Sequence, residues 1–444
     1  MINKIINDIT DKNIAILGFG IEGKSTYNFI RRYLPNEKLI IIDESLNKSS
    51  LNDENVTIIN NDWKTKLNNF DIIFKTPGIS LLDIETNNIK DKITSQLQIL
   101  LKHFDNLSIG ITGSKGKSTT ASLTHQILID QGKDAYLLGN IGNPPLDYIE
   151  KFNKDTIFVI EMAVYQLEYM TYSPKIAAIL NFYEEHLDFF GTIENYYNSK
   201  LNIFNYQNKN DIAIYNGNNE TLINYIQNTK FKSNLLEINK NNNQCKCYIK
   251  DNYIYIDKQK IFDINTKTKL LGSHNLENIM FALTISNLLN LNLDQTIKTI
   301  KDFNGLENRM EMYKTHNHIT FYSDTIATIP EATINCIKAL KNVNTLIFGG
   351  KDRGIDYEDF INFLNQSEIE NFICMPDTGT KIGKCLINKN VLFLKDMKEV
   401  VEKAYKITKK DTICLLSPAA ASYNKYKSFT EKGEDYKKCI DELK

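Results

Sequence analysis

The segment between Gly110 and Thr120, which reads GITGSKGKSTT, has the residue types of a phosphate-binding turn. An apolar stretch typical of a strand precedes it, and residues with the apolar spacing of a helix follow it. Such a turn directs backbone N–H groups and a helix N-terminus at one point, which favours an anionic phosphate. Lys117 adds a positive charge for the outer phosphates, and the hydroxyls of Ser118 and Thr119 suit a magnesium ion.

The glycines of this turn depart from the strict GxxxxGK[ST] pattern, because Ile111 stands where the first glycine is expected. The backbone cradle that remains consists of Gly113, Ser114, Lys115 and Gly116. A solvated turn that happens to carry glycine and lysine is the alternative interpretation. The order strand, turn, helix favours the phosphate site over that alternative.

Three further side chains follow apolar strands or helices in ways that suit metal binding. Glu161 ends the apolar stretch 156–160, where a carboxylate beside a phosphate loop is well placed for Mg²⁺, and a solvated helix cap is the alternative. His186 follows the stretch 175–181 and precedes Lys200 by 14 residues. Taken alone, His186 is more typical of a packed core histidine. For Lys200, a lysine on the surface of a helix is the alternative interpretation.

A second glycine-rich turn lies near the N-terminus. Gly18, Gly20 and Gly23 form GxGxxG after the apolar stretch 13–17, and Asp43 follows about 20 residues later at the end of another strand. This pattern is typical of a Rossmann-like unit and alone would suggest an NAD-dependent oxidoreductase. It is weak evidence for NAD, because any pyrophosphate can use such a turn.

The composition is that of an ordinary globular protein. The 444 residues suggest about three domains, and 42% apolar and 24% charged residues are typical of globular chains. The net charge of −1 argues against a general affinity for nucleic acid or membranes. Without a leader or a long apolar run, the cytoplasm is the expected location. The seven scattered cysteines are expected to be free thiols.

Several longer motifs resemble the Mur ligase family, whose members make amide bonds to cell-wall precursors or folate. The resemblance covers nearly the whole chain. Besides the phosphate loop, the matching segments are KTPGI at 75–79, GNIG at 139–142, HLD with a following tyrosine and lysine at 186–200, GSHNLEN at 272–278, GLENRME at 305–311, SDTIATIP at 323–330 and SPAAAS with a later Phe and Gly at 417–433.

The resemblance implies an α/β fold of three domains. These would be a Rossmann-like UDP-substrate domain at 1–104, a central P-loop ATPase-like domain at 105–304 and a Rossmann-like amino-acid domain at 305–444. It also implies the cofactors ATP and Mg²⁺, the latter at two sites. The expected metal ligands are Ser118, Glu161, His186 and carbamylated Lys200, and Lys117 joins the last three as a catalytic group.

The resemblance further assigns the other candidate residues. Nucleotide would be held by the phosphate loop and by Asn275, Asn278, Arg309 and Asp324. The UDP-substrate would contact Gly18, Gly20, Gly23, Asp43, Thr76, Gly78, Asn140 and Gln166, although Asn140 and Asn275 are also typical capping residues. Thr328, Arg353, Ser422 and Phe429 match a glutamate pocket. The implied reaction adds D-glutamate to UDP-N-acetylmuramoyl-L-alanine through an acyl phosphate, in peptidoglycan precursor synthesis, by a monomer.

Five positions in these motifs depart from the family pattern. Ala163 and Val164 replace two serines after Glu161, and Asn308, Ile326 and Ala420 replace a histidine, a lysine and a cysteine. The two hydroxyls missing at Ala163 and Val164, together with Ile326 in place of the usual lysine, leave two alternatives open. One is a ligase that adds L-glutamate, and the other is a non-catalytic relative.

Overall fold

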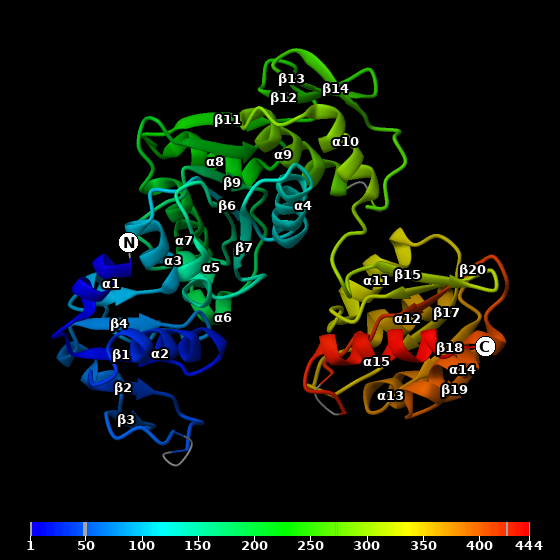
Figure 1. Ribbon diagram of the computed structural model, residues 1–444. Coiled ribbons are helices and arrows are strands. Elements are labelled where there is room, and N and C mark those ends of the chain that lie inside the picture. The colour runs from blue at the N-terminus through cyan, green and yellow to red at the C-terminus, as the bar shows by residue number, and fades with distance from the viewer. Residues whose placement is uncertain (1, 48–50, 271, 273, 423–424, 444) are drawn as a thin grey trace. The chain divides into compact units, whose positions relative to one another are not determined.

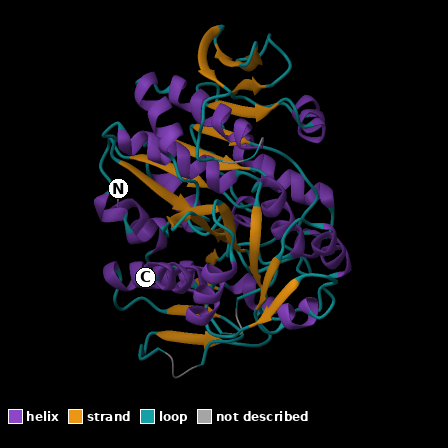
Figure 2. Ribbon diagram, turned by 90° about the vertical axis from the view of Figure 1, so that its right-hand side faces the viewer, coloured by secondary structure: helices purple, strands orange, loops and turns teal. Residues whose placement is uncertain are grey.

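The chain folds into two compact units, as a computed structural model describes for residues 2–47, 51–270, 272, 274–422 and 425–443. One unit comprises residues 1–267 and 273–301, and the other comprises residues 268–272 and 302–444. The larger unit contains two sheets and the smaller unit a third (Figure 1). Parallel strands alternate with helices in both units (Figure 2), which confirms the α/β class. The domain limits at residues 104 and 304 stay predictions.

The first sheet is parallel throughout and has the order β3-β2-β1-β4-β5. Its strand β1 consists of four apolar residues, all buried, as expected for a parallel sheet covered on both faces. The strands are β1 Ile14–Leu17, β2 Leu39–Ile42, β3 Val56–Ile59, β4 Ile72–Lys75 and β5 Ile93–Thr94. The helices are α1 Ile2–Ile9, α2 Ile21–Tyr33, α3 Gln96–His103 and the short 3-10 turns Lys64–Asn69 and Lys90–Lys92.

The second sheet has nine strands in the order β14-β13-β12-β11-β10-β9-β6-β8-β7. They are β6 Ser108–Thr112, β7 Ala135–Gly139, β8 Ile157–Glu161, β9 Ile176–Ile179, β10 Ile212–Asn216, β11 Asn234–Ile238, β12 Cys247–Lys250, β13 Tyr253–Ile256 and β14 Gln259–Asp263. Strands β12 to β14 pair antiparallel at one edge, and the other pairs are parallel. The β12–β13 turn places Asp251 and Asn252 at positive φ, the geometry that a two-residue hairpin requires.

Helices surround this second sheet. They are α4 Lys117–Asp130, α5 Val164–Leu167, α6 Leu187–Phe190, α7 Ile193–Asn205, α8 Glu220–Asn228, α9 His274–Leu288 and α10 Leu293–Asp302, with 3-10 turns at Pro145–Asp147 and Ile149–Lys151. The first and second sheets share one hydrophobic core, which runs from Ile5 to Ile226. Polar contacts also join them, since Ser25 Oγ donates to Asp147 Oδ1 at 2.6 Å. The two sheets of the larger unit are therefore held together as one body.

The smaller unit has a six-stranded sheet in the order β15-β16-β20-β17-β18-β19, with β15 as an antiparallel edge. Its strands are β15 Glu311–His316, β16 Ile319–Ser323, β17 Val343–Phe348, β18 Asn371–Cys374, β19 Asn390–Phe393 and β20 Thr412–Leu416. Its helices are α11 Pro330–Ala339, α12 Glu358–Gln366, α13 Thr378–Gly383, α14 Met397–Ile407 and α15 Phe429–Asp441. Separate apolar cores cover its two faces.

All seven cysteines are free thiols, as predicted. Cys247, Cys336, Cys374, Cys414 and Cys439 are buried, Cys245 is half-buried and Cys385 is exposed. Within the described ranges, none of the helices combines the length and apolar character needed to span a membrane.

Candidate functional site

The predicted phosphate loop has the expected strand, turn and helix. Strand β6 ends at Thr112, and α4 begins at Lys117 with Gly116 as its N-cap at φ +86°. A Cβ atom at Gly116 would lie 2.5 Å from Oδ1 of Asn278, so both the backbone angle and the available space require glycine. Thr120 Oγ1 donates to the same Oδ1 at 3.1 Å. The start of α9 is thereby fastened to the loop, although Leu271 and Ser273 of the preceding motif lie outside the described residues.

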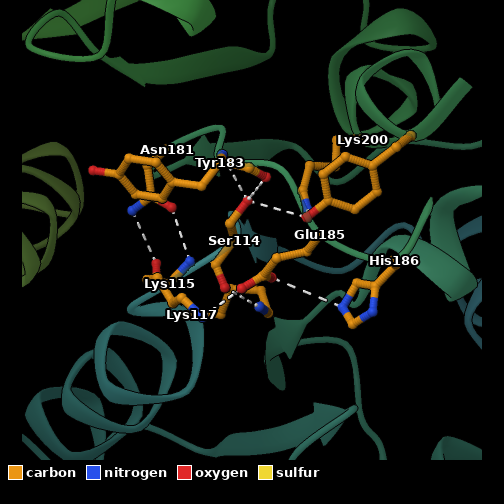
Figure 3. A network of polar contacts seen from close by, with 9 residues as sticks. Ser114, Lys115, Lys117, Asn181, Tyr183, Glu185, His186 and Lys200 are labelled. Atoms are coloured by element: carbon orange, nitrogen blue, oxygen red, sulfur yellow. Dashed lines mark hydrogen bonds and ion pairs between the residues drawn. The ribbon is translucent and has the colours of Figure 1, made fainter. Parts of the chain in front are cut away.

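The loop is clamped by Asn181, the second residue after β9 (Figure 3). The Asn181 side chain accepts a hydrogen bond from Lys115 N at 2.8 Å and donates one to Lys115 O at 3.0 Å. The backbone N–H of Ser114 donates to Asn181 O at 3.0 Å, and Lys117 Nζ donates to Ser114 O at 3.0 Å. These contacts hold the turn closed and keep Lys117 next to it.

Ser114 links the loop to helix α7. Its hydroxyl donates to Tyr183 O and accepts from Tyr183 N, both at 2.9 Å. The same oxygen lies 3.1 Å from the hydroxyl of Tyr196, to which Lys200 Nζ donates at 2.7 Å. Ser114, Tyr196 and Lys200 are all buried.

Lys200 is 2% exposed, so the interpretation as a surface lysine is wrong. Its Nζ lies 4.0 Å from the centre of the Tyr196 ring. Burial lowers the pKa of Lys200 to about 6, and the positive charge of Lys117 adds to this effect. Both effects favour the uncharged amine, while the nearby carboxylate of Glu185 opposes them.

Glu161 ends β8, directly beside β6 in the sheet, where it pairs in register with Ile111. It is fully buried, so the alternative of a solvated cap is wrong. Its Oε1 accepts a hydrogen bond from Asn140 Nδ2 at 2.8 Å, while Oε2 has no hydrogen-bond partner among the described residues. Asn140 therefore orients Glu161 in this structure, and its contact with a substrate stays a prediction.

His186 lies at the N-terminus of α6 with φ +60° and a half-exposed side chain, so it is not a packed core histidine. Its Nε2 lies 3.8 Å from Oε2 of Glu185, whose other oxygen pairs with Lys115 of the phosphate loop. Burial lowers the pKa of His186, with Glu185 opposing the shift. A neutral imidazole is the form that binds metals.

The residues present fit a magnesium ion that shares its coordination with a nucleotide. The described ranges contain no group of three or more His, Cys, Asp or Glu side chains arranged to hold a metal. Mg²⁺ usually binds one or two carboxylates together with phosphate oxygens and water, rather than a cage of protein ligands. The buried, unpartnered oxygen of Glu161 suits that arrangement. Ser118, the second residue of α4, supplies a hydroxyl near the loop.

The N-terminal glycine motif lies at the carboxyl edge of the first sheet, between β1, β2 and β4. A Cβ at Gly18, which has φ +91°, would lie 2.1 Å from Oγ1 of Thr76. The backbone N–H of Phe19 donates to Asp43 Oδ2 at 2.8 Å. Strand order reverses at β1, and such a reversal is where open α/β sheets bind ligands. Of the other glycines predicted for this site, Gly20 is the N-cap of α2, Gly23 lies in the first turn of α2 and Gly78 lies in the turn after β4.

The smaller unit brings together most of its predicted site residues at the carboxyl ends of β16, β17 and β20. Asp324 is 3% exposed and accepts from Met310 N and Ser417 Oγ, and burial raises its pKa to about 6. Arg309, the residue before Met310, adds a positive charge that opposes this shift. Asn275 and Asn278 belong to the larger unit, so the predicted nucleotide set is divided between the units.

The predicted glutamate residues also lie in the smaller unit. Arg353 Nη2 donates to Thr328 O at 3.3 Å, and Thr325 Oγ1 donates to Phe429 O at 2.8 Å. The hydroxyl of Ser422 is buried and has no hydrogen-bond partner among the described residues, so it retains its capacity to bind a ligand.

A buried lysine supports the glycine loop that leads to Arg353. Lys432 of α15 is 2% exposed and donates to Gly349 O at 2.7 Å. Burial lowers the pKa of Lys432 to about 7, and the charge of Lys425 acts in the same direction.

Four of the departures from the family pattern, Ala163, Val164, Asn308 and Ala420, are buried, and Ile326 is half-buried. Ala163 and Val164 are 6% and 4% exposed at the start of α5, and Gln166 Oε1 accepts from Ala163 N at 3.1 Å. Asn308 is buried and accepts a hydrogen bond from Ser323 Oγ at 3.0 Å.

Asn181, Glu185 and Tyr196 were not singled out as site residues from the sequence, because their partners lie 66 to 82 residues away along the chain.

The fold and the site define the chain as an α/β protein with a glycine-rich strand–turn–helix loop. Comparison with known proteins identifies the family within this class. The model of the Mur ligase middle domain matches residues 111–286, and that of the Mur ligase, glutamate ligase domain matches residues 308–420. The chain belongs to the Mur ligase family. A UDP-N-acetylmuramoylalanine--D-glutamate ligase of Clostridioides difficile (strain 630) is 30% identical, over 98% of this chain and 100% of its own. The protein of that name from Bacillus cereus (strain G9842) is 28% identical, over 99% and 100%.

Solved structures share the fold. A UDP-N-acetylmuramate-alanine ligase, MurC, from Thermotoga maritima has a TM-score of 0.60 at 14% identity, covering 98% of this chain and 100% of its own. A MurF ligase from Thermotoga maritima in complex with ADP has a TM-score of 0.56 at 16% identity, covering 98% and 96%. At these identities the likeness concerns the fold.

Proposed function

We propose that this protein is an ATP-dependent ligase that adds D-glutamate to UDP-N-acetylmuramoyl-L-alanine in peptidoglycan precursor synthesis. The observation that carries the proposal is the clamped phosphate loop, which contacts the segment of Glu185 and His186 and the Tyr196–Lys200 pair. The full-length similarity to proteins named for this reaction supports the choice of substrates. The acceptor substrate is linked to a nucleotide and ATP drives the reaction, so we place the enzyme in the cytoplasm, and we expect it to act as a monomer.

The chemistry needs activation, because a carboxylate is a poor electrophile for an amine at neutral pH. Transfer of the γ-phosphoryl group of ATP to the substrate carboxylate gives an acyl phosphate with a good leaving group. In this step the loop N–H groups and Lys117 bind phosphate oxygens and stabilise charge as it moves. The amine of glutamate then attacks the acyl carbon, and phosphate leaves.

Magnesium would neutralise phosphate charge during the transfer. Ser118 and Glu161 would hold one ion, and His186 with Lys200 would hold a second. Lys200 suits this role once it is carbamylated, since its uncharged amine can react with carbon dioxide to give a carboxylate-like ligand. The Asn140 hydrogen bond keeps the Glu161 carboxylate oriented, with its unpartnered Oε2 left for the metal.

Two sites, each at the carboxyl ends of the strands of a sheet, would bind the other substrates. The crevice of the first sheet, with Gly18, Asp43 and Thr76, would hold the UDP group, and Gln166 the muramoyl part. In the smaller unit, Arg353 can pair with one carboxylate of glutamate and Ser422 can hydrogen-bond another oxygen. Thr328 and Phe429 would complete that pocket.

A phosphate-release assay tests this function. The enzyme is supplied with ATP, Mg²⁺ and UDP-N-acetylmuramoyl-L-alanine, together with D-glutamate, L-glutamate or neither. We expect release that requires both the acceptor and D-glutamate, with mass spectrometry showing the amide product. Release confined to L-glutamate would transfer the assignment to the other enantiomer. ATP binding without release for either enantiomer would favour a non-catalytic relative, for which Ala163 and Val164 are the motivating residues.

A further inference from the structure

Tyr196 lies between the phosphate loop and Lys200 and has no part in the reaction described so far. It is fully buried on α7. Its hydroxyl lies 2.7 Å from Lys200 Nζ and 3.1 Å from Ser114 Oγ. One hydroxyl therefore contacts both a candidate metal ligand and a candidate nucleotide-binding residue (Figure 3 shows Ser114 and Lys200).

The number of hydrogens fixes the direction of these contacts. The Ser114 hydroxyl has a single hydrogen, which it donates to the carbonyl of Tyr183. Between Ser114 and Tyr196, the hydrogen must therefore come from Tyr196. Because the hydrogen of Tyr196 is then used, its oxygen accepts from an N–H of Lys200. The chain of donors runs from Lys200 through Tyr196 and Ser114 to the Tyr183 carbonyl.

This direction determines how a carbamate on Lys200 would be held. When the amine attacks carbon dioxide, an N–C bond forms, one proton leaves to water and one N–H remains on the nitrogen. Tyr196 can accept that last N–H and would thereby hold the nitrogen end of the carbamate. We propose that Tyr196 is a positioning residue that orients the Lys200 carbamate and links it, through Ser114, to the phosphate loop. This inference rests on the proposed carbamylation.

A phenylalanine at position 196 removes the hydroxyl and leaves the ring. The ring packs against Phe190 and Tyr197, with centroid distances of 5.7 and 5.4 Å. Ser114 keeps both of its contacts with Tyr183. Tyr196→Phe therefore deletes the link selectively, and the fold should be retained. Tyr197→Phe is the matched control, since it removes a hydroxyl from the next residue, whose ring stacks on Phe182.

The test is carbon-13 NMR of the full chain with labelled bicarbonate, which detects the carbamate without turnover. Wild type and Tyr197→Phe should show the signal, and Lys200→Ala should lack it. In Tyr196→Phe, loss of one hydrogen bond should raise the bicarbonate needed for half-occupancy about tenfold. The inference would be overturned if Tyr196→Phe and Tyr197→Phe reached half-occupancy at the same bicarbonate concentration. Absence of the carbamate signal in wild type would overturn it as well. The phosphate-release assay judges the proposed function separately, because neither result depends on the other.

Discussion

Two buried lysines, Lys200 and Lys432, differ from the exposed lysines that make up most of the basic residues. Neither of their hydrogen bonds goes to a carboxylate, since Lys200 donates to a phenol and Lys432 to a backbone carbonyl. Burial without a hydrogen-bonded carboxylate disfavours the ammonium form. Lys117 differs from both, because it is half-buried at the start of α4 and remains placed to meet phosphate.

Lys117→Ala should reduce turnover by about 100-fold or more, by comparison with the loss of other preorganised electrostatic groups. The reason is that Lys117 is expected to act on charge that develops during phosphoryl transfer. Phosphate release at saturating substrates measures the effect. Lys133→Ala, at an exposed position just past the same helix, is the control and should leave turnover unchanged. Near-normal turnover by a folded Lys117→Ala enzyme would remove Lys117 from the proposed mechanism.

At the residue level, the sequence predicted side chains that belong to local motifs and missed those defined by distant contacts. Glu161 ends a strand, and Lys117 and His186 come shortly after strands, so their places could be predicted from apolar runs and glycines. The sequence alone did not decide whether Lys200 is a metal ligand or an exposed lysine on the surface of a helix. The clamp by Asn181 and the bridge by Tyr196 depend on how β9 and α7 pack against the loop, which no local pattern encodes.

At the scale of elements, the turn from β6 to α4 depends on Gly116. Gly116→Ala should destabilise the protein by about 2–3 kcal/mol, because it adds a clash with Asn278 to the strain of a positive φ. Gly132→Ala is the matched control, because Gly132 also has a positive φ and no atom lies within 4 Å of its Cβ position. The control should cost about 1 kcal/mol. Thermal unfolding of both variants measures the difference, and equal losses would contradict the proposed role of Asn278.

Helix α15 is expected to give the smaller unit a pH-dependent stability. The pKa of Lys432 falls from 10.5 to about 7 on folding, so between these values the unfolded chain binds the proton that the folded chain lacks. Stability should therefore rise with pH in this window, by about 1 kcal/mol per pH unit from this group. Lys432→Met should lose that slope between pH 7 and 9 in calorimetry. Lys438→Met, exposed on the same helix, should keep it, and an unchanged slope in Lys432→Met would refute the assignment.

Strands were predictable where apolar residues run without interruption, as in β1, β8 and β20, because parallel strands in a covered sheet are buried on both faces. The edge strands were harder to find. Strands β15 and β19 consist of half-buried or exposed residues, many of them polar. The alternation of apolar and polar residues that indicates a strand is therefore weak in both. Their pairing is set by the neighbouring strand rather than by their own sequence.

At the scale of the whole molecule, separate cores in the two units predict two thermal transitions. Gly116→Ala should lower the midpoint temperature of the larger unit's transition alone. The pH effect of Lys432→Met should appear only in the transition of the smaller unit. ATP at 100 times its dissociation constant should stabilise the Gly116-sensitive transition by about 2.7 kcal/mol. Calorimetry of the full chain measures all three effects. A single transition that responds to both substitutions would show that the units unfold together.

The distribution of free thiols has a practical consequence for chemical labelling. Burial raises the pKa of Cys247, Cys374 and Cys414 to about 12 and that of Cys439 to about 11, so their reactive thiolate forms are scarce near neutral pH. Burial, with Glu237 nearby, also raises the pKa of half-buried Cys245 to about 12. Cys385 is the exposed member of the seven, in the smaller unit. A maleimide dye at pH 7 should therefore attach first at Cys385 in the wild-type chain, giving a fluorescent reporter without any cysteine having to be removed.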